Sequence, residues 1–502
     1  FGSSHYVLNA ACPLGDRSSG SLHVGPSPME DEQARGSHSD GRCTSFSLME
    51  DGQHSPEVYA RRPSRGNCIG KRVRNAAAAV FCVILMLPAA WSAVAPGGIP
   101  LTLLADAQAR CLDGTPPGFY FDASTDRMDG ENSRKWVFFL DGGGECSSVE
   151  ECLPKLESPL GSSDFFPNSK SDLPKLASWK ESVNPGFHNW NRVFLMYCSQ
   201  DLWTGQHGAA KASSKDLPPD GGPLLRFQGH TILKEVLDYF DTDLQHATDI
   251  ILSGESAGGL GVFNNIDYVE KRYRESAGKA KKHRTSVVAA PIAGMYFYAH
   301  PFEGPGHTGS DLSDFREPAW ASHYEFWDSR VNVECSARLP PHTCLLPNIT
   351  FPFITAPVFV SEAQTDKVQL TAHDWVDAIS VQHHEPHVMA YLAEWQKNMT
   401  QALHCHVLGK CSNGCEAGQR SITAIVDQLP NNDLMSMKPK LERGFFNPAC
   451  FIHTEFTHVD GPWIGDYSYA TALQEWYYQD RSFYLEDGPE VGIMQGHCAA
   501  HG

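Results

Sequence analysis

The chain contains too few basic residues for a nucleic-acid-binding surface. It has 40 Lys and Arg against 59 Asp and Glu, a formal net charge of −19 at pH 7. From residue 101 onward, acidic residues outnumber basic ones by 51 to 31. Binding to nucleic acid requires a basic footprint, so we exclude it as a function. A strongly acidic surface also repels polyanionic glycans, unless a local basic groove overrides it.

Large aliphatic residues are scarce in residues 1–70, which are rich in Ser, Gly, Pro, Arg and His. We expect this segment to be disordered and to form a cytoplasmic tail. Lys71 and Arg72 then precede an uncharged run at 76–95, long enough to cross a bilayer. Basic residues on its N-terminal side predict a type II signal anchor at 71–96. A cleaved signal peptide is the alternative, because residues 93–95 read Ala-Val-Ala.

The sequence GESAG at 254–258 is the most informative motif in the chain. It follows an apolar run at 250–253 that is typical of a buried strand, and it precedes a stretch that can open a helix. A G-x-S-x-G sequence between a strand and a helix forms a nucleophile elbow, whose tight turn exposes the serine hydroxyl. The motif predicts Ser256 as a nucleophile, although a Gly-rich loop also fits the pentapeptide alone.

A glycine-rich segment upstream supplies the second part of such a site. The strand-like run at 135–140 ends in DGGG at 141–144. A hydrolase elbow needs an amide N–H from a loop after an earlier strand, to hold the developing oxyanion. Three glycines let the backbone come close to a ligand, since no Cβ atom is in the way. The segment therefore favours an oxyanion hole over a plain turn.

An acid and a histidine must follow the serine in this class of hydrolase. The strand-like run at 356–360 leads into SEAQTD at 361–366, where Glu362 and Asp366 both fit on spacing. His453 lies in NPACFIHT at 447–454, and His458 is its rival five residues later. Spacing alone leaves both alternatives open.

Taken together, these motifs resemble the pectin acetylesterase family, which includes the Notum carboxylesterases. The resemblance covers roughly 105–498, and the motifs occur in the order of the family. The similar segments are CLDGTPP at 111–117, DGGGEC at 141–146 with Cys152, NWNRV at 189–193, YCSQDLWTG at 197–205, FQG at 227–229, SGESAGG at 253–259, DKVQ at 366–369, CFIH at 450–453 and EWYYQDR at 475–481.

The resemblance implies a serine carboxylesterase with an acyl-enzyme mechanism and no metal or cofactor. It implies Ser256 as nucleophile, Asp366 as orienting acid and His453 as base, which agrees with the analysis of the motifs. It also implies an oxyanion hole, formed by amides around Gly143, Gly144 and Ala257.

Two residues near the nucleophile depart from the family pattern. Glu145 follows the triple glycine, where the family usually has an aromatic residue, and Glu255 replaces the usual Cys or Ser before the nucleophile. The aspartate that usually precedes Gly294 is absent. We predict that Glu145, Trp203 and Glu255 line the substrate pocket. The Glu255 carboxylate could raise the pKa of the imidazolium, but we favour a solvated side chain that points away.

Cysteines are abundant after the apolar segment, which indicates an oxidising compartment. Eleven of the fifteen cysteines lie there, so at least one is free or pairs between chains. Spacing and the family resemblance imply a Cys146–Cys152 disulfide. The group Cys405, Cys411 and Cys415 with His404 and His406 would suit zinc, but we favour disulfides. Two glycosylation sequons, at Asn348 and Asn398, fit the same secretory address.

The pattern of apolar runs predicts an α/β-hydrolase-like fold. Strand-like runs occur near 135–140, 192–198, 249–253, 285–290 and 356–361, and an apolar stripe with helical spacing occupies 232–240. We therefore expect a mostly parallel, doubly wound sheet with helices on both faces. The long stretch at 298–350 is interpreted as a lid or cap. No internal repeat is evident.

These observations favour an enzyme that removes a short acyl group, most simply acetyl, from a glycan. The alternative is a Notum-like deacylase that removes a fatty acyl group from a protein. A third hypothesis is a catalytically dead protein that binds glycans or acts as a scaffold. In each case we expect a secretory-pathway protein, either secreted or anchored in the membrane by 71–96 with a lumenal or extracellular catalytic domain.

Overall fold

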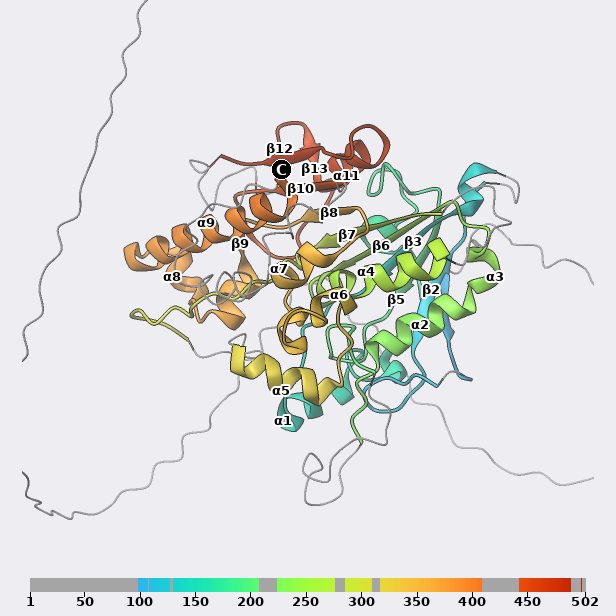
Figure 1. The fold of residues 1–502 in the computed structure, drawn as a ribbon, viewed down its shortest axis with the longest axis horizontal. Coiled ribbons are helices and arrows are strands. Elements are labelled where there is room, and N and C mark those ends of the chain that lie inside the picture. Colours follow the sequence, from blue (N-terminus) through green and yellow to red (C-terminus); the bar gives the residue numbers. More distant parts are fainter. Residues whose placement is uncertain are drawn as a thin grey trace, which may run out of the picture. The chain divides into compact units, whose positions relative to one another are not determined.

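A ten-stranded sheet forms the centre of the fold (Figure 1). The computed structural model describes residues 98–106, 108–126, 130–206, 224–275, 285–308, 317–408, 442–488 and 498. The strand order is β14-β10-β8-β7-β6-β3-β5-β2-β1-β4. In chain order the strands are β1 (Ile99–Leu103), β2 (Gly118–Asp122), β3 (Lys135–Leu140), β4 (Ser169–Lys170), β5 (Asn191–Leu195), β6 (Asp249–Glu255), β7 (Ser286–Ile292), β8 (Val358–Ser361), β10 (Arg443–Asn447) and β14 (Tyr484–Glu486).

Seven neighbouring strands, from β14 to β5, are parallel, and the last three pair antiparallel. Central strands such as β3 and β5 are buried over almost their whole length, as expected for a sheet covered on both faces. β3 and β6 are neighbours in the sheet. After β3 the chain continues to β5 on one side of this pair, and after β6 it continues to β7 on the other side. Such a switch point is where open α/β sheets carry their sites.

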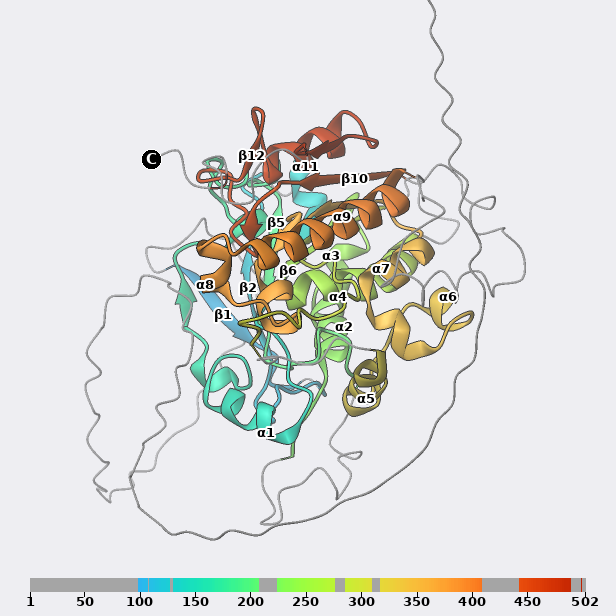
Figure 2. The same ribbon diagram turned by 90° about the vertical axis from the view of Figure 1, so that its left-hand side faces the viewer.

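Helices cover both faces of this sheet, which confirms the predicted α/β-hydrolase-like class. The main helices are α2 (Gly229–Tyr239), α4 (Ala257–Glu275), α5 (Glu317–Trp327), α9 (Pro386–Leu408) and α11 (Tyr469–Tyr478). Shorter ones are α1 (Val149–Cys152), α3 (Asp241–Leu244), α6 (Val333–Ser336), α7 (Pro347–Thr350) and α8 (Ala378–Gln382). Figure 2 shows α2, α4 and α9 on the same side of the sheet. On the other face, Trp476 of α11 packs against Phe359 of β8.

Two small ribbons complete the described part. Strand β9 (Thr365–Asp366) pairs in parallel with β11 (Phe451–Ile452), and β12 (Trp463–Ile464) pairs antiparallel with β13 (Tyr467–Ser468). The first ribbon matters for function, because it joins the segment after β8 to the segment after β10.

The stretch predicted to form a cap contains α5, α6 and α7 within its described residues. Trp327 at the end of α5 donates a hydrogen bond from Nε1 to the Cys146 carbonyl at 2.9 Å. Ser329 pairs with Gly205 in an isolated antiparallel bridge. The segment therefore packs beside the loop that follows β3, while its role as a lid stays a prediction.

Several disulfides are present in the described residues, as is typical of proteins of the secretory pathway, and two of them join distant parts of the chain. The described pairs are Cys111–Cys198, Cys146–Cys152, Cys335–Cys344 and Cys450–Cys498. Cys405 is also disulfide-bonded, so it is not a zinc ligand. Cys411 and Cys415 lie outside the described residues.

The two predicted glycosylation sites differ in accessibility. Asn348 in α7 is only 4% exposed, and Thr350 of the same sequon is fully buried. A glycan on Asn348 is incompatible with this packing, so that prediction is wrong for the folded chain. Asn398 lies on α9 and is partly exposed, and its glycosylation stays a prediction.

The predicted tail at 1–70 and the apolar segment at 71–96 lie outside the described residues. Among the helices that the structure does describe, none is long and apolar enough to cross a membrane.

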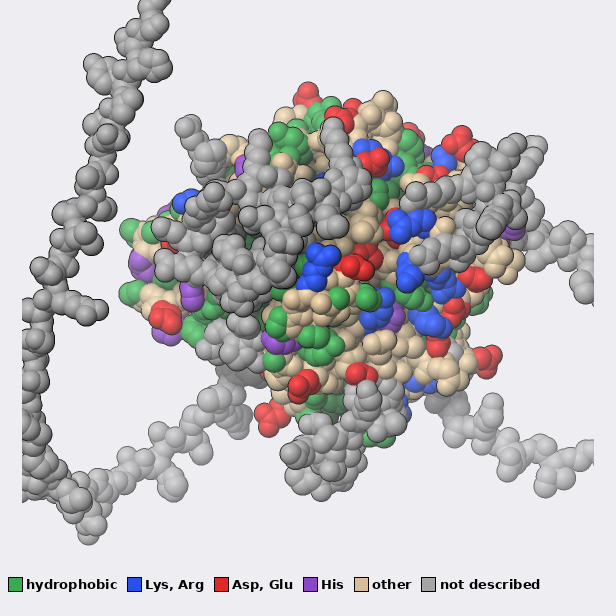
Figure 3. Space-filling view, viewed as in Figure 1, with side chains coloured by type: hydrophobic (Ala, Val, Ile, Leu, Met, Phe, Trp, Pro, Cys, Tyr) green, Lys and Arg blue, Asp and Glu red, His purple; other side chains and the backbone are tan. Residues whose placement is uncertain are grey.

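Charges of opposite sign lie side by side on the face shown in Figure 3. Between α2, α3 and α4, Asp238 pairs with both Lys234 and Arg272 at 2.7 Å. Arg272 also reaches Asp241 at 2.8 Å. Positive charge in this region is thus paired locally.

Replacing Trp476 tests the packing between α11 and the sheet. Its side chain is fully buried against Phe359, so Trp476→Ala should lower the free energy of unfolding by about 3–5 kcal/mol. The measurement is urea denaturation under non-reducing conditions. Ile379→Ala is the control, because Ile379 is 60% exposed and its loss should cost less than about 0.5 kcal/mol. Equal effects of the two changes would contradict the described packing.

Candidate active site

Ser256 lies in a strained turn between β6 and α4. Its φ is +54°, in the left-handed region that non-glycine residues rarely adopt. A Cβ atom on Gly258 would lie 2.1 Å from the Leu140 carbonyl oxygen, so only glycine fits there. The Ser256 N–H donates to the Ile292 carbonyl of β7 at 3.0 Å. The motif GESAG thus adopts the geometry of a nucleophile elbow.

A chain of hydrogen bonds joins Ser256 to a histidine and an acid. The Ser256 hydroxyl lies 2.8 Å from His453 Nε2, and His453 Nδ1 lies 2.7 Å from Asp366 Oδ2. The second oxygen of Asp366 accepts the Gln369 N–H at 2.8 Å. Asp366 is fully buried, and the other two side chains are nearly so. This is the arrangement by which a serine hydroxyl is activated.

The β9–β11 ribbon explains how residues 87 positions apart meet. Asp366 is the last residue of β9, and its partner in the parallel register is Ile452 of β11. His453 follows directly, so the pairing places the imidazole beside the carboxylate. The disulfide Cys450–Cys498 attaches the start of this loop to the C-terminal segment.

Glu362 and His458, the alternative acid and base from the sequence, make their described hydrogen bonds to other groups than the triad residues Ser256 and His453. Glu362 accepts the Met295 N–H at 2.7 Å and makes no described contact with His453. His458 Nδ1 bonds to the hydroxyl of Ser468, the N-cap residue of α11, at 2.8 Å. The geometry therefore selects Asp366 and His453, while their catalytic roles stay predictions.

The glycine-rich loop after β3 runs beside the elbow, because Leu140 pairs with Gly254 in the sheet. Gly143 and Gly144 both have positive φ, at +142° and +69°. A Cβ atom on Gly143 would lie 2.3 Å from the Leu160 side chain. The carbonyl of Gly143 accepts a hydrogen bond from Gln200 Nε2 at 3.2 Å, which fixes the loop.

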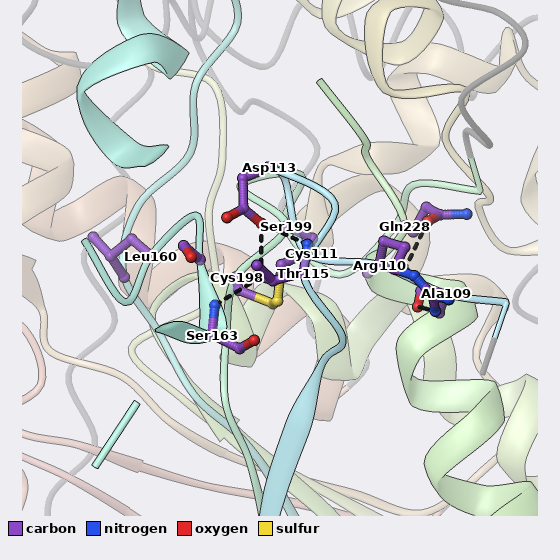
Figure 4. The surroundings of a disulfide bond; sticks show 12 residues. Ala109, Arg110, Cys111, Asp113, Thr115, Leu160, Ser163, Cys198, Ser199 and Gln228 are labelled. Carbon is purple, nitrogen blue, oxygen red and sulfur yellow. Dashed lines mark hydrogen bonds between the residues drawn. A yellow bond between two sulfur atoms is a disulfide. The ribbon is translucent and has the colours of Figure 1, made fainter. Parts of the chain in front are cut away.

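Figure 4 shows that the segment carrying Leu160, which packs against the glycine-rich loop, is linked to the Cys111–Cys198 disulfide. The turn after Cys111 is attached to Cys198 by the disulfide, and Thr115 in that turn accepts the Ser163 N–H at 2.9 Å. Leu160 lies in the same segment as Ser163. Ala257, the other predicted oxyanion residue, is the first residue of α4. The positions suit an oxyanion hole, which stays a prediction.

Tyr296 belongs to the site, although no sequence motif marks it. Its hydroxyl makes a hydrogen bond with the Ser256 side chain, and its ring centroid lies 6.5 Å from that of His453. Burial, followed by the charges of Asp366, Glu145 and Glu362, raises the pKa of Tyr296 well above 10. Tyr296 follows the end of β7, the strand next to β6. A neighbouring strand end is the signal that could have identified it.

The charges around His453 favour its protonated form. Burial lowers the pKa of His453, but the Asp366 carboxylate, with its hydrogen bond, outweighs burial. Glu455 and Glu255 add to this, so the net pKa lies above the ordinary value of 6.5. The Glu455 carboxylate also accepts the His453 backbone N–H at 2.7 Å.

The expectation that Glu255 is solvated and points away is wrong. Its carboxylate lies 2.5 Å from Lys175 Nζ, and its side chain is only 15% exposed. The ion pair holds Glu255 close enough to the imidazole to raise the pKa of His453. Its charge therefore acts on the site, although Lys175 offsets part of it.

Trp203 does not line a pocket, contrary to prediction. It is fully buried, stacks on Tyr197 at 5.4 Å, and donates from Nε1 to the Asp141 carbonyl at 2.9 Å. Through this hydrogen bond to Asp141, Trp203 holds the start of the glycine-rich loop. Glu145, in contrast, is buried directly after that loop, and its charge raises the pKa of Tyr296. Glu145 therefore lies near the nucleophile.

The sheet and the elbow define an α/β hydrolase, and a solved structure of the Wnt deacylase Notum from Drosophila has the same fold. The TM-score is 0.58 at 21% identity, and the match covers 80% of this chain and 98% of that chain. A profile of the Pectinacetylesterase family matches residues 94–490. The chain belongs to this family of carboxylesterases, which implies an acylated substrate.

Two relatives illustrate the range of the family. Pectin acetylesterase 7 of Arabidopsis thaliana is 26% identical over 424 residues, 81% of this chain and 95% of that protein. Palmitoleoyl-protein carboxylesterase notum1a of Danio rerio is 35% identical over 280 residues, 54% of this chain and 51% of that protein. The match to notum1a thus spans about half of each chain.

The pH dependence of serine labelling tests the charges around His453. The base must be neutral, so labelling of Ser256 by a fluorophosphonate should accelerate as pH rises through a pKa above 6.5. Glu255→Gln removes a negative charge and should move this inflection to lower pH, by up to about one unit. Glu131→Gln, at the far end of β3, is the control and should leave it in place. An unchanged inflection in Glu255→Gln would show that this charge does not reach the imidazole.

Proposed function

We propose that the protein is a serine carboxylesterase in which Ser256, His453 and Asp366 form the catalytic triad. The continuous hydrogen-bonded chain from Asp366 to the Ser256 hydroxyl is the observation that supports this. His453 takes the hydroxyl proton as the oxygen attacks the ester carbonyl. Amides around Gly143, Gly144 and Ala257 stabilise the oxyanion.

The same groups complete the reaction. His453 returns its proton to the leaving alcohol, and the acyl group stays on Ser256. Water, deprotonated by His453, then attacks the acyl-enzyme and releases the acid. Asp366 accepts from His453 Nδ1 throughout, so it fixes the tautomer and stabilises the imidazolium.

The acyl group is short, most simply acetyl, and the substrate is an acylated glycan. A long acyl chain needs an apolar channel, because burying polar groups against hydrocarbon without compensation is costly. Here the buried Glu145 follows the glycine-rich loop, and the Tyr296 hydroxyl contacts Ser256. The match to pectin acetylesterase 7 over almost its whole length supports the same choice.

The alternative is a deacylase that removes a fatty acyl group from a protein. Its support is the 35% identity to notum1a, a palmitoleoyl-protein carboxylesterase. The complete hydrogen-bonded triad argues against a catalytically dead glycan-binding or scaffold protein. Failure of a fluorophosphonate to label Ser256 would restore that hypothesis.

Hydrolysis of p-nitrophenyl acetate by triad variants tests the mechanism. Ser256→Ala should abolish turnover, and His453→Ala should lower kcat by at least about a thousandfold, because only the oxyanion hole and substrate binding remain. His458→Ala is the matched control and should stay within about tenfold of wild type. A dead His458→Ala with an active His453→Ala would reverse the assignment of the base.

Chain-length preference separates the two substrate classes. The wild type should hydrolyse p-nitrophenyl acetate faster than the octanoate, and Glu145→Leu should shift this preference toward octanoate by removing the buried carboxyl group. Glu150→Leu, on the exposed surface of α1, is the control. A wild-type maximum at octanoate or longer would favour the fatty-acyl alternative instead.

A further inference from the structure

Two carboxyl groups meet beneath the proposed triad. Glu362 follows β8 and Asp366 ends β9, and both are fully buried. One oxygen of Glu362 accepts the Met295 N–H at 2.7 Å. The other oxygen, Oε1, is buried and accepts no hydrogen bond from any N–H or O–H group of the described residues, and the neighbour with which the Glu362 side chain interacts is the Asp366 carboxyl group.

Two carboxylates cannot share a hydrogen bond unless one of them carries a proton. Asp366 already accepts from His453 Nδ1 with one oxygen and from the Gln369 N–H with the other, so both of its oxygens act as acceptors. Glu362 has the Met295 N–H, but burial first and the Asp366 charge second raise its pKa well above the ordinary value. The proton therefore resides on Glu362.

We propose that Glu362 is a positioning residue, a neutral carboxylic acid that donates to Asp366 while accepting from Met295. It joins two parts of the site. On one side it orients the carboxylate that holds His453. On the other it holds the segment after β7, which carries Tyr296 to Ser256. This inference rests on the proposed function.

The role of Glu362 depends on pH in a defined direction. Below its raised pKa, Glu362 is neutral and donates. As pH rises through that pKa, the proton and the hydrogen bond are lost, and a second negative charge appears beside Asp366. Activity should therefore fall on the alkaline side.

Other titratable groups face the same region, and the effect of their titration on activity must be distinguished from that of Glu362. They are Asp374, Tyr296, Glu145 and His453. Asp374 is the main rival, because burial raises its pKa to about 8 and Asp366 adds to the shift. Its carboxylate accepts a hydrogen bond from Trp395 Nε1 at 2.8 Å.

The experiment measures kcat and KM for p-nitrophenyl acetate from about pH 6 to about pH 10. Glu362→Gln keeps a neutral side chain that can donate to Asp366 and accept from Met295. It should retain kcat within about threefold at neutral pH and lose the alkaline decline of the wild type. Glu362→Leu can do neither, and should lower kcat at least about tenfold with a smaller change in KM. Asp374→Asn is the control and should keep the decline.

Four outcomes would overturn the inference. They are a wild-type profile without an alkaline decline, an unchanged decline in Glu362→Gln, a Glu362→Gln variant as impaired as Glu362→Leu, and loss of the decline in Asp374→Asn. Circular dichroism across the pH range separates loss of activity from unfolding, and Glu362→Gln decides the matter if Glu362→Leu does not fold. Failure of the proposed function has a different signature, namely Ser256→Ala hydrolysing the ester as fast as wild type.

Discussion

The strained turn at Ser256 is the constraint on which the rest of the site depends. A left-handed conformation at a serine costs about 1–2 kcal/mol, so the surrounding structure must hold it in place. The Ser256 N–H bonds to β7, α4 begins at the next residue, and Gly258 touches the carbonyl of Leu140 at the end of β3. Three neighbouring elements therefore fix the one backbone angle that presents the hydroxyl to His453.

Negative charge dominates the surroundings of that hydroxyl. Asp366, Glu455 and Glu255 all stabilise the imidazolium of His453, and Lys175 offsets part of the charge of Glu255. An imidazole with a raised pKa is a stronger base, but it is neutral only at higher pH. The same low-dielectric surroundings place a proton on Glu362, so a buried pair of acids carries one charge instead of two. Neighbouring carboxylates thus set the strength of the base, and burial sets the charge of Glu362.

The departures from the family pattern lie close to the nucleophile. Glu255 precedes Ser256 and raises the pKa of His453, and Glu145 follows the glycine-rich loop and raises the pKa of Tyr296. The loop itself is held by groups remote in sequence, including Gln200, Trp203 and the segment joined to the Cys111–Cys198 disulfide. The chain therefore combines the fold of a solved Notum structure with two carboxyl groups close to the nucleophile.

Local patterns in the sequence were sufficient for the sheet and the elbow. Apolar runs marked β3, β5, β6, β7 and β8, because buried parallel strands need continuous hydrophobic residues, and GESAG marked the turn, because only glycine tolerates the close approach at its ends. Spacing could not choose between Glu362 and Asp366, since both follow the same strand end. That choice was made by the β9–β11 pairing, which sets Asp366 beside His453. The ion pair of Glu255, the burial of Trp203 and Asn348, and the contact of Tyr296 were likewise decided by tertiary packing, because each joins segments whose proximity no local pattern encodes.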